Sequence, residues 1–169
     1  MQVYIPATLA MLQQLVADGS LSPVNGTAFA VTPALREAYA EGDDDELAEV
    51  ALREAALASL RLLALDDDDD ATESLPLRRA VLAAEVEDVK YRPDLDDAVV
   101  RLGGPVGLDH VVAAYVDNSD AEPAVVAAIE VIDAADLGDE DADLVVGDAQ
   151  DHDLAWYATQ ELPFLLDLL

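Results

Sequence analysis

In the first forty residues, the spacing of apolar residues alternates between that of a strand and that of a helix. Apolar positions recur at every second residue in two short stretches and at every third or fourth residue in two others. Thr8 and Thr32 precede the helical stretches as N-caps, and Gly19 ends the first of them. The pattern predicts strands over 2–5 and 27–31 and helices over 9–17 and 33–42.

The strongest helical signal lies at 44–65. Asp43 and Glu46 have the spacing of a capping box, and Glu49 and Arg53 have the i,i+4 spacing of an exposed ion pair. The second half of this segment carries leucine almost all round the helix axis. We therefore expect a central helix that is buried on most sides.

An acidic break follows this helix. Five consecutive aspartates, Asp66 to Asp70, repel one another, which predicts a mobile acidic loop at about 66–75. Beyond this break the helical spacing of apolar residues ends. Short valine-rich runs bounded by Pro, Gly or Asp follow, and such runs are typical of strands. These runs occupy residues 79–86, 98–102 and 111–116.

Two further helices complete the predicted order. Ser119 and Glu122 have capping-box spacing and open a helix that ends at Gly138. A last helix is predicted over 151–169, with a kink at Pro163. The order βαβααβββαα segregates helices from strands and favours an α+β fold. We expect one domain over 1–169, with a mixed sheet of four to five short strands packed by about five helices.

Charge excludes several classes of function. The 169 residues include 37 acidic and 8 basic side chains, a formal net charge of -29. Nucleic acids and anionic lipids need Lys or Arg to neutralise their phosphates, so neither is an expected partner. The chain has no cysteine, no apolar run long enough to span a membrane and no evident signal peptide. These features predict a cytoplasmic protein.

Searches for established motifs identify no cofactor or specific metal site. Phosphate-binding glycine loops, zinc motifs and the nucleophile elbow are all missing. Asp139, Asp141 and Asp143 match positions 1, 3 and 5 of a calcium loop. Leu144 and Gln150 then replace the required glycine and bidentate glutamate, so only weak, non-specific cation binding is expected.

Candidate chemistry is confined to the C-terminal segment. In a helix, His152, Trp156 and Gln160 share one face, and Tyr157 and Glu161 lie on the next. A carboxylate beside the histidine would orient it as a general base. The competing interpretation makes Trp156 and Tyr157 anchors of a terminal helix on the core, with the histidine at its rim.

Four strings together resemble a family of uncharacterised actinobacterial proteins, a domain of unknown function. They are residues 3–9 (VYIPATL), 32–39 (TPALREAY), 58–63 (ASLRLL) and 151–161 (DHDLAWYATQE). The resemblance implies a bacterial cytoplasmic protein from a GC-rich genome, and it assigns no chemistry.

Two hypotheses of function remain. The favoured one is a small non-enzymatic binding or regulatory module for a protein partner. The acidity has three competing explanations: a solvated surface suited to a salty cytoplasm, GC-rich codon usage, or a negative field that docks a basic partner or mimics a nucleic acid. A binding module should expose an apolar or aromatic patch. The alternative is a small hydrolase-like enzyme, in which His152 should meet a second polar group in a concave pocket.

Overall fold

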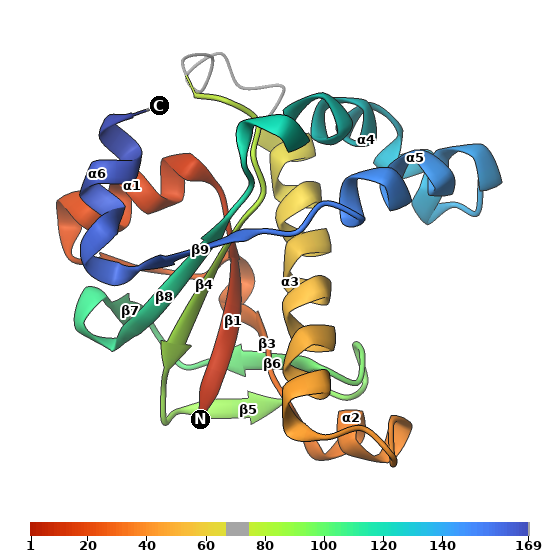
Figure 1. The fold of residues 1–169 in the computed structure, drawn as a ribbon. Coiled ribbons are helices and arrows are strands. Elements are labelled where there is room, and N and C mark those ends of the chain that lie inside the picture. The colour runs from red at the N-terminus through yellow and green to blue at the C-terminus, as the bar shows by residue number, and fades with distance from the viewer. Residues whose placement is uncertain (67–74, 169) are drawn as a thin grey trace.

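The computed structural model describes residues 1–66 and 75–168, which fold into mixed helix and strand (Figure 1). The strands are β1 (Gln2–Ala7), β2 (Ser20–Leu21), β3 (Thr27–Phe29), β4 (Ala80–Glu85), β5 (Val89–Tyr91), β6 (Val99–Leu102), β7 (Val106–Gly107), β8 (Val111–Val116) and β9 (Ala155–Ala158). The α-helices are α1 (Leu9–Asp18), α2 (Pro33–Ala38), α3 (Asp44–Asp66), α4 (Glu122–Asp136), α5 (Glu140–Gln150) and α6 (Leu162–Asp167).

The main sheet has seven strands in the order β5-β6-β3-β1-β4-β8-β9, and β2 and β7 form a separate pair. The expectation of four to five strands was wrong. The five predicted strands form the centre of the sheet, and the two that the pattern missed, β5 and β9, are its edges. Both are very short, so two-residue alternation has little length in which to show. The described residues contain six α-helices, where about five were predicted.

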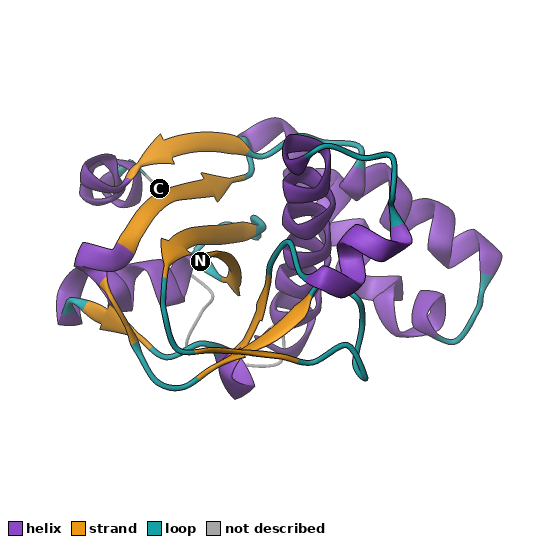
Figure 2. Ribbon diagram, turned by 90° about the horizontal axis from the view of Figure 1, so that it is seen from below, coloured by secondary structure: helices purple, strands orange, loops and turns teal. Residues whose placement is uncertain are grey.

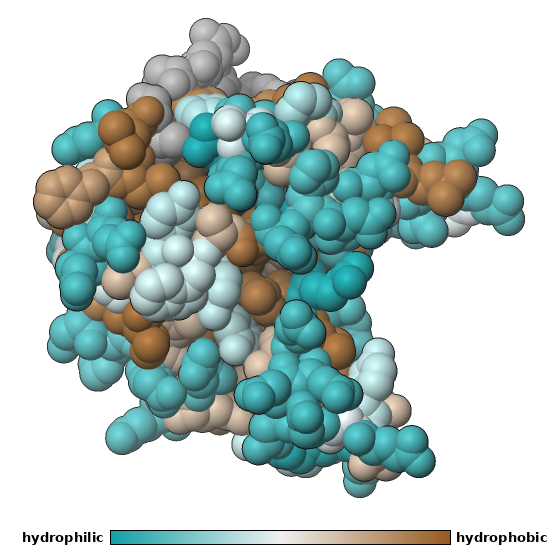
Figure 3. All heavy atoms as spheres, viewed as in Figure 1, coloured by the Kyte–Doolittle hydropathy of each residue, from teal (hydrophilic) through white to brown (hydrophobic). Residues whose placement is uncertain are grey.

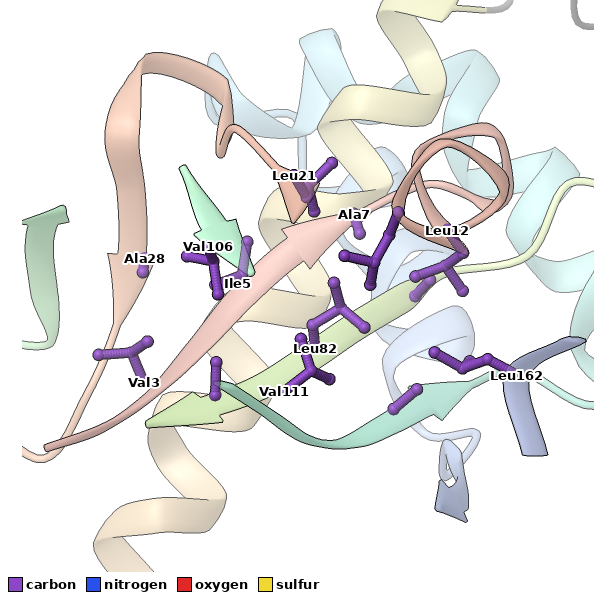
Figure 4. Close-up of a cluster of buried hydrophobic side chains, with 14 of the residues drawn as sticks. Val3, Ile5, Ala7, Leu12, Leu21, Ala28, Leu82, Val106, Val111 and Leu162 are labelled. Atoms are coloured by element: carbon purple, nitrogen blue, oxygen red, sulfur yellow. The ribbon is translucent and has the colours of Figure 1, made fainter. Parts of the chain in front are cut away.

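Helices cover both faces of this sheet (Figure 2). On one face, α1 and α6 enclose a core of aliphatic side chains from the central strands (Figure 4). Val3, Ile5 and Leu82 of this core are fully buried, as is Leu162 at the start of α6. Thr8 caps α1 as predicted, its hydroxyl accepting from the N–H of Met11 at 3.3 Å.

The opposite face is covered by α3, which is the central helix that the sequence predicted. Ala51 and Ala55 face the sheet, whereas Leu60 and Leu63 pack against α4 and α5. The predicted cap is present, since Asp43 Oδ1 accepts from the N–H of Glu46 at 2.8 Å. Asp66 is the last residue of α3, and the rest of the predicted acidic loop, up to residue 74, lies outside the described residues.

The segment after Ser119 differs from its prediction. Residues 119–121 form a 3-10 turn, and Pro123 lies in the first turn of α4, so the expected capping box does not form. The acidic stretch from Asp139, tested above as a calcium loop, is instead the start of α5. Asp139 caps this helix by accepting from the N–H of Ala142 at 2.9 Å, and carboxylates in a first helical turn are favoured by the helix dipole.

The C-terminal segment also differs. Residues 151–169 were predicted as one kinked helix, but residues 155–158 form strand β9, which pairs antiparallel with β8. Pro163 lies in the first turn of α6 and so begins a helix instead of kinking one. The helical spacing of the candidate residues was therefore coincidental. What decides the conformation is the free edge of β8, a tertiary partner that local spacing does not report.

No helix in the described parts of the chain is both long enough and apolar enough to cross a membrane.

Candidate functional site

Strand β9 forms one edge of the main sheet and exposes the single tryptophan of the chain. Trp156 is 58% exposed, so the expectation that it anchors the core was wrong. Its register partner on β8 is Tyr115, which packs against the core beneath α3. Side chains alternate between the two faces of a sheet along a strand. Trp156 therefore lies on the face that α3 covers, and Tyr157 packs against the core on the opposite face, which α1 and α6 cover.

The main chain of β9 is also open along this edge. The N–H of Asp117 donates to the C=O of Arg79 at 3.1 Å, so Asp117 bonds towards β4. Successive residues of a strand in an antiparallel sheet form their main-chain hydrogen bonds to opposite neighbouring strands. Tyr115 is two residues before Asp117 and therefore also bonds towards β4. Its partner Trp156 then directs its N–H and C=O away from the sheet, as does Ala158. Among the described residues no hydrogen bond reaches the N–H or C=O of Trp156. The C=O of Ala158 instead begins the 3-10 turn Thr159–Glu161 and accepts its first hydrogen bond, so only the N–H of Ala158 is left open.

The two edges of the sheet differ in chemistry. The opposite edge, β5, carries Lys90, the only lysine of the chain, and a charged side chain in an edge strand opposes pairing with another chain. Strand β9 reads Ala-Trp-Tyr-Ala and has no charged residue. Of the two edges, β9 is the one that lacks this protection.

The candidate residues from the sequence are distributed along this edge and do not form a helical face. His152 is half-buried just before β9, and Gln160 and Glu161 are exposed just after it. Trp156 lies between them on β9, whereas Tyr157 faces the core on the α1 and α6 side. The structure therefore aligns four of the five candidates along one edge and separates the fifth.

A buried arginine fixes the chain where it enters β9. Arg79 is 1% exposed and forms a bidentate pair with Asp117 through Nε and Nη2, at 2.9 and 2.8 Å. Nη2 also donates to the C=O of His152 at 2.8 Å, and Nη1 donates to Gln150 Oε1 at 2.9 Å. This cluster holds the linker between α5 and β9 against the start of β4. Sequence reasoning placed Arg79 at a strand start and missed this role.

A hollow of about 140 Å³ lies between this linker and α3. Figure 3 shows a largely hydrophilic face on which apolar surface is visible in a central recess. Leu52, Ala56 and Leu154 supply the apolar lining. The polar lining comes from Glu49, Arg53, Arg79, Gln150, His152 and Asp153. His152 therefore meets polar groups from distant parts of the chain, and we call this site the His152 hollow.

Arg53 is the unusual member of this lining. Five other arginines of the described residues hold a carboxylate, in the pairs Arg36–Asp44, Arg61–Asp136, Arg78–Glu122, Arg79–Asp117 and Arg92–Asp94. The predicted pair of Arg53 with Glu49 does not form, although both residues line the hollow. Exposed i,i+4 pairs stabilise little, so such a pair is easily given up. In the described parts of this acidic protein, two arginines have no carboxylate partner: Arg53, and Arg101, which donates instead to the C=O of Asn25 at 2.9 Å. Of these two, Arg53 is the one that lines the hollow.

A second hollow, of about 480 Å³, lies at the far end of β4. Its rim includes Glu85, Asp88 and His110, all of them exposed to solvent. The described residues contain no group of three or more histidine, aspartate or glutamate side chains placed to hold a metal ion. The hollow beside β9 differs in having the buried Arg79 in its lining.

The chain belongs to a family of unknown function, DUF6912, whose sequence model matches residues 1–166. The expected family resemblance is confirmed to that extent, and the match carries no activity. No curated protein and no solved structure matches the chain significantly.

Proposed function

We propose that this protein is a non-enzymatic binding module that takes an extended, basic segment of a partner protein along strand β9. The observation that carries the proposal is the open edge of β9, where a 58% exposed tryptophan and unpaired main-chain groups occur together. An extended peptide added to such an edge gains main-chain hydrogen bonds, and side chains at alternate positions give specificity. Exposed tryptophans are frequent anchors of protein interfaces.

The negative charge of the protein favours a basic partner over a second copy of this chain. With a net charge of -29, two copies of this chain repel each other, which opposes pairing of β9 with β9 of a second copy. A basic segment is attracted by the same field. The ends of β9 add local attraction, because Asp151 and Asp153 precede the strand, Glu161 follows it and all three are exposed. We place this function in the cytoplasm of an actinobacterium, as the composition and the resemblance imply.

The alternative, a small hydrolase-like enzyme, is favoured by one observation, the position of His152 in a hollow with Glu49 and Asp153. The lining of that hollow contains no serine, threonine or lysine to act as nucleophile. Its volume of about 140 Å³ is also well below the roughly 300 Å³ at which ligand pockets of small-molecule enzymes begin. The binding module is therefore the preferred function.

The test compares two synthetic peptides, alternating Lys-Val and alternating Glu-Val, of equal length. We expect the lysine peptide to bind, to change the fluorescence of Trp156 and to slow hydrogen exchange at the amides of Trp156 and Ala158. Trp156→Lys should abolish this binding, because it removes the aromatic anchor and places a charge in the edge strand.

The matched control is Tyr91→Lys on the opposite edge. Tyr91 is 48% exposed, and this variant adds the same charge to the protein, so general electrostatics change equally. Binding should survive in it. Protection at β5 instead of β9, or equal loss in both variants, would overturn the proposal. A stable dimer in sedimentation that Trp156→Lys dissociates would replace the basic partner with a second copy.

A further inference from the structure

We infer that the segment added to β9 is the carboxy-terminal tail of the partner, with its terminal carboxylate bound in the His152 hollow against Arg53. The inference rests on the proposed function and specifies the part of the partner that is recognised.

Strand direction is the first argument. Every strand pairing of the main sheet is antiparallel, so a strand that extends it in the same manner runs opposite to β9. Such a segment passes Ala158 first and Ala155 last. Its carboxy end therefore leaves the sheet at residues 152–154, and these three residues line the hollow.

The chemistry of the hollow is the second argument. Arg53 is without a carboxylate among the described residues of a protein with 37 acidic side chains. Guanidinium groups bind carboxylates through two parallel hydrogen bonds. The Gln150 amide lies in the same lining, held by Arg79 at 2.9 Å and by its own donation to the Arg53 C=O at 3.5 Å. The exposed Arg53 side chain and the Gln150 amide, which is held in place, can both donate to one carboxylate.

The remaining charges of the lining fit a basic tail. Glu49 and Asp153 also line the hollow, and they would repel an isolated anion. A carboxylate that ends a lysine- or arginine-rich segment brings positive charge to these two side chains. The lining therefore matches a ligand that carries both signs, with the carboxylate on Arg53 and basic side chains on the two acids.

The experiment uses the alternating Lys-Val peptide in two forms, one with a free carboxy terminus and one with a terminal amide. Amidation removes a negative charge, so general attraction to a protein of charge -29 predicts tighter binding of the amide. Our inference predicts the reverse order, with the free acid tighter by about tenfold or more, the effect of one charge-assisted hydrogen bond. Arg53→Gln should remove this preference.

Arg36→Gln is the control, because Arg36 is an exposed arginine of α2 that pairs with Asp44 at the N-terminal end of α3 and does not line the hollow. It removes the same charge and should keep the preference for the free acid. Equal binding of the two forms to the unmodified protein, or a preference that survives Arg53→Gln, would overturn the inference while leaving edge binding in place. Failure of both forms to bind would instead overturn the proposed function. Circular dichroism checks that both variants remain folded.

Discussion

Arg79 and Asp117 form an ion pair whose side chains are 2% and 0% exposed, and the pair lies where β4 begins and β8 ends. The main-chain N–H of Arg79 also donates to Asp117 Oδ2 at 2.8 Å. Two charges removed from water to this extent are tolerated because nearly all their polar atoms are bonded. The pair thereby fixes the linker that carries His152 and leads into β9.

Arg79→Met should cost about 3–5 kcal/mol of unfolding free energy, because Asp117 is then buried without a counter-charge. Asp117→Leu should cost a similar amount, and the double variant should cost less than either single one. Arg61→Met is the control, since the Arg61–Asp136 pair is 46% and 43% exposed. It should cost less than about 1 kcal/mol. Urea denaturation measures all four, and equal losses for Arg61→Met and Arg79→Met would contradict the assignment.

Trp156→Ala should cost less than about 1 kcal/mol, as substitutions of exposed side chains usually do. Leu162→Ala, at a residue with 0% exposure in the core under α1, should cost about 2–5 kcal/mol. Because Trp156 is the only tryptophan, acrylamide quenching reports its exposure directly, and efficient quenching is expected. A loss for Trp156→Ala that equals the loss for Leu162→Ala would restore the interpretation of Trp156 as a core anchor.

The sequence predicted those elements whose signals lie within the element itself. Thr8, Asp43 and the leucine-rich half of α3 predicted two helix starts and the central helix, because caps and apolar stripes are local signals. The strand β9 could not be recognised in this way. Its four residues are too few to distinguish the helical from the strand spacing of apolar positions. The deciding factor is pairing with the edge of β8, about forty residues earlier in the chain.

The candidate site was half recognised for the same reason. His152 and Trp156 were selected because histidine and tryptophan are rare in this chain. Arg53, Arg79 and Gln150 come from three separate elements and meet only through the tertiary fold. An arginine directly before a strand and an aspartate directly after another were visible signals. The sequence does not give the strand order, so it does not show that Arg79 and Asp117 lie next to each other.

Glu54→Gln should stabilise the protein at neutral pH. Burial, and secondarily the charge of Asp96, raise the pKa of Glu54 above its ordinary value of 4.5. The folded state therefore holds this proton more tightly than the unfolded state, so the ionised carboxyl costs stability at high pH. That cost is relieved as the pH falls through the raised pKa, and it is gone below the unfolded value.

The gain from Glu54→Gln should accordingly disappear as the pH is lowered past about 4.5. Glu41→Gln is the control, because Glu41 is exposed and its substitution removes the same charge. Denaturation midpoints across pH 3.5 to 7 separate the two variants. A pH-independent gain, or the same gain from Glu41→Gln, would assign the effect to net charge instead of to burial.

Added salt should raise the melting temperature of the protein. A net charge of -29 makes the compact state repel itself, and the unfolded chain spreads the same charges further apart. Monovalent salt shortens the range of this repulsion from ~30 Å at 0.01 M to ~3 Å at 1 M. Glu41→Lys, which removes one exposed negative charge and adds a positive one, should therefore raise the melting temperature more at 0.01 M than at 1 M. Calorimetry in sodium chloride measures both trends, and a melting temperature that stays flat or falls over this range would show that self-repulsion does not limit the stability of this fold.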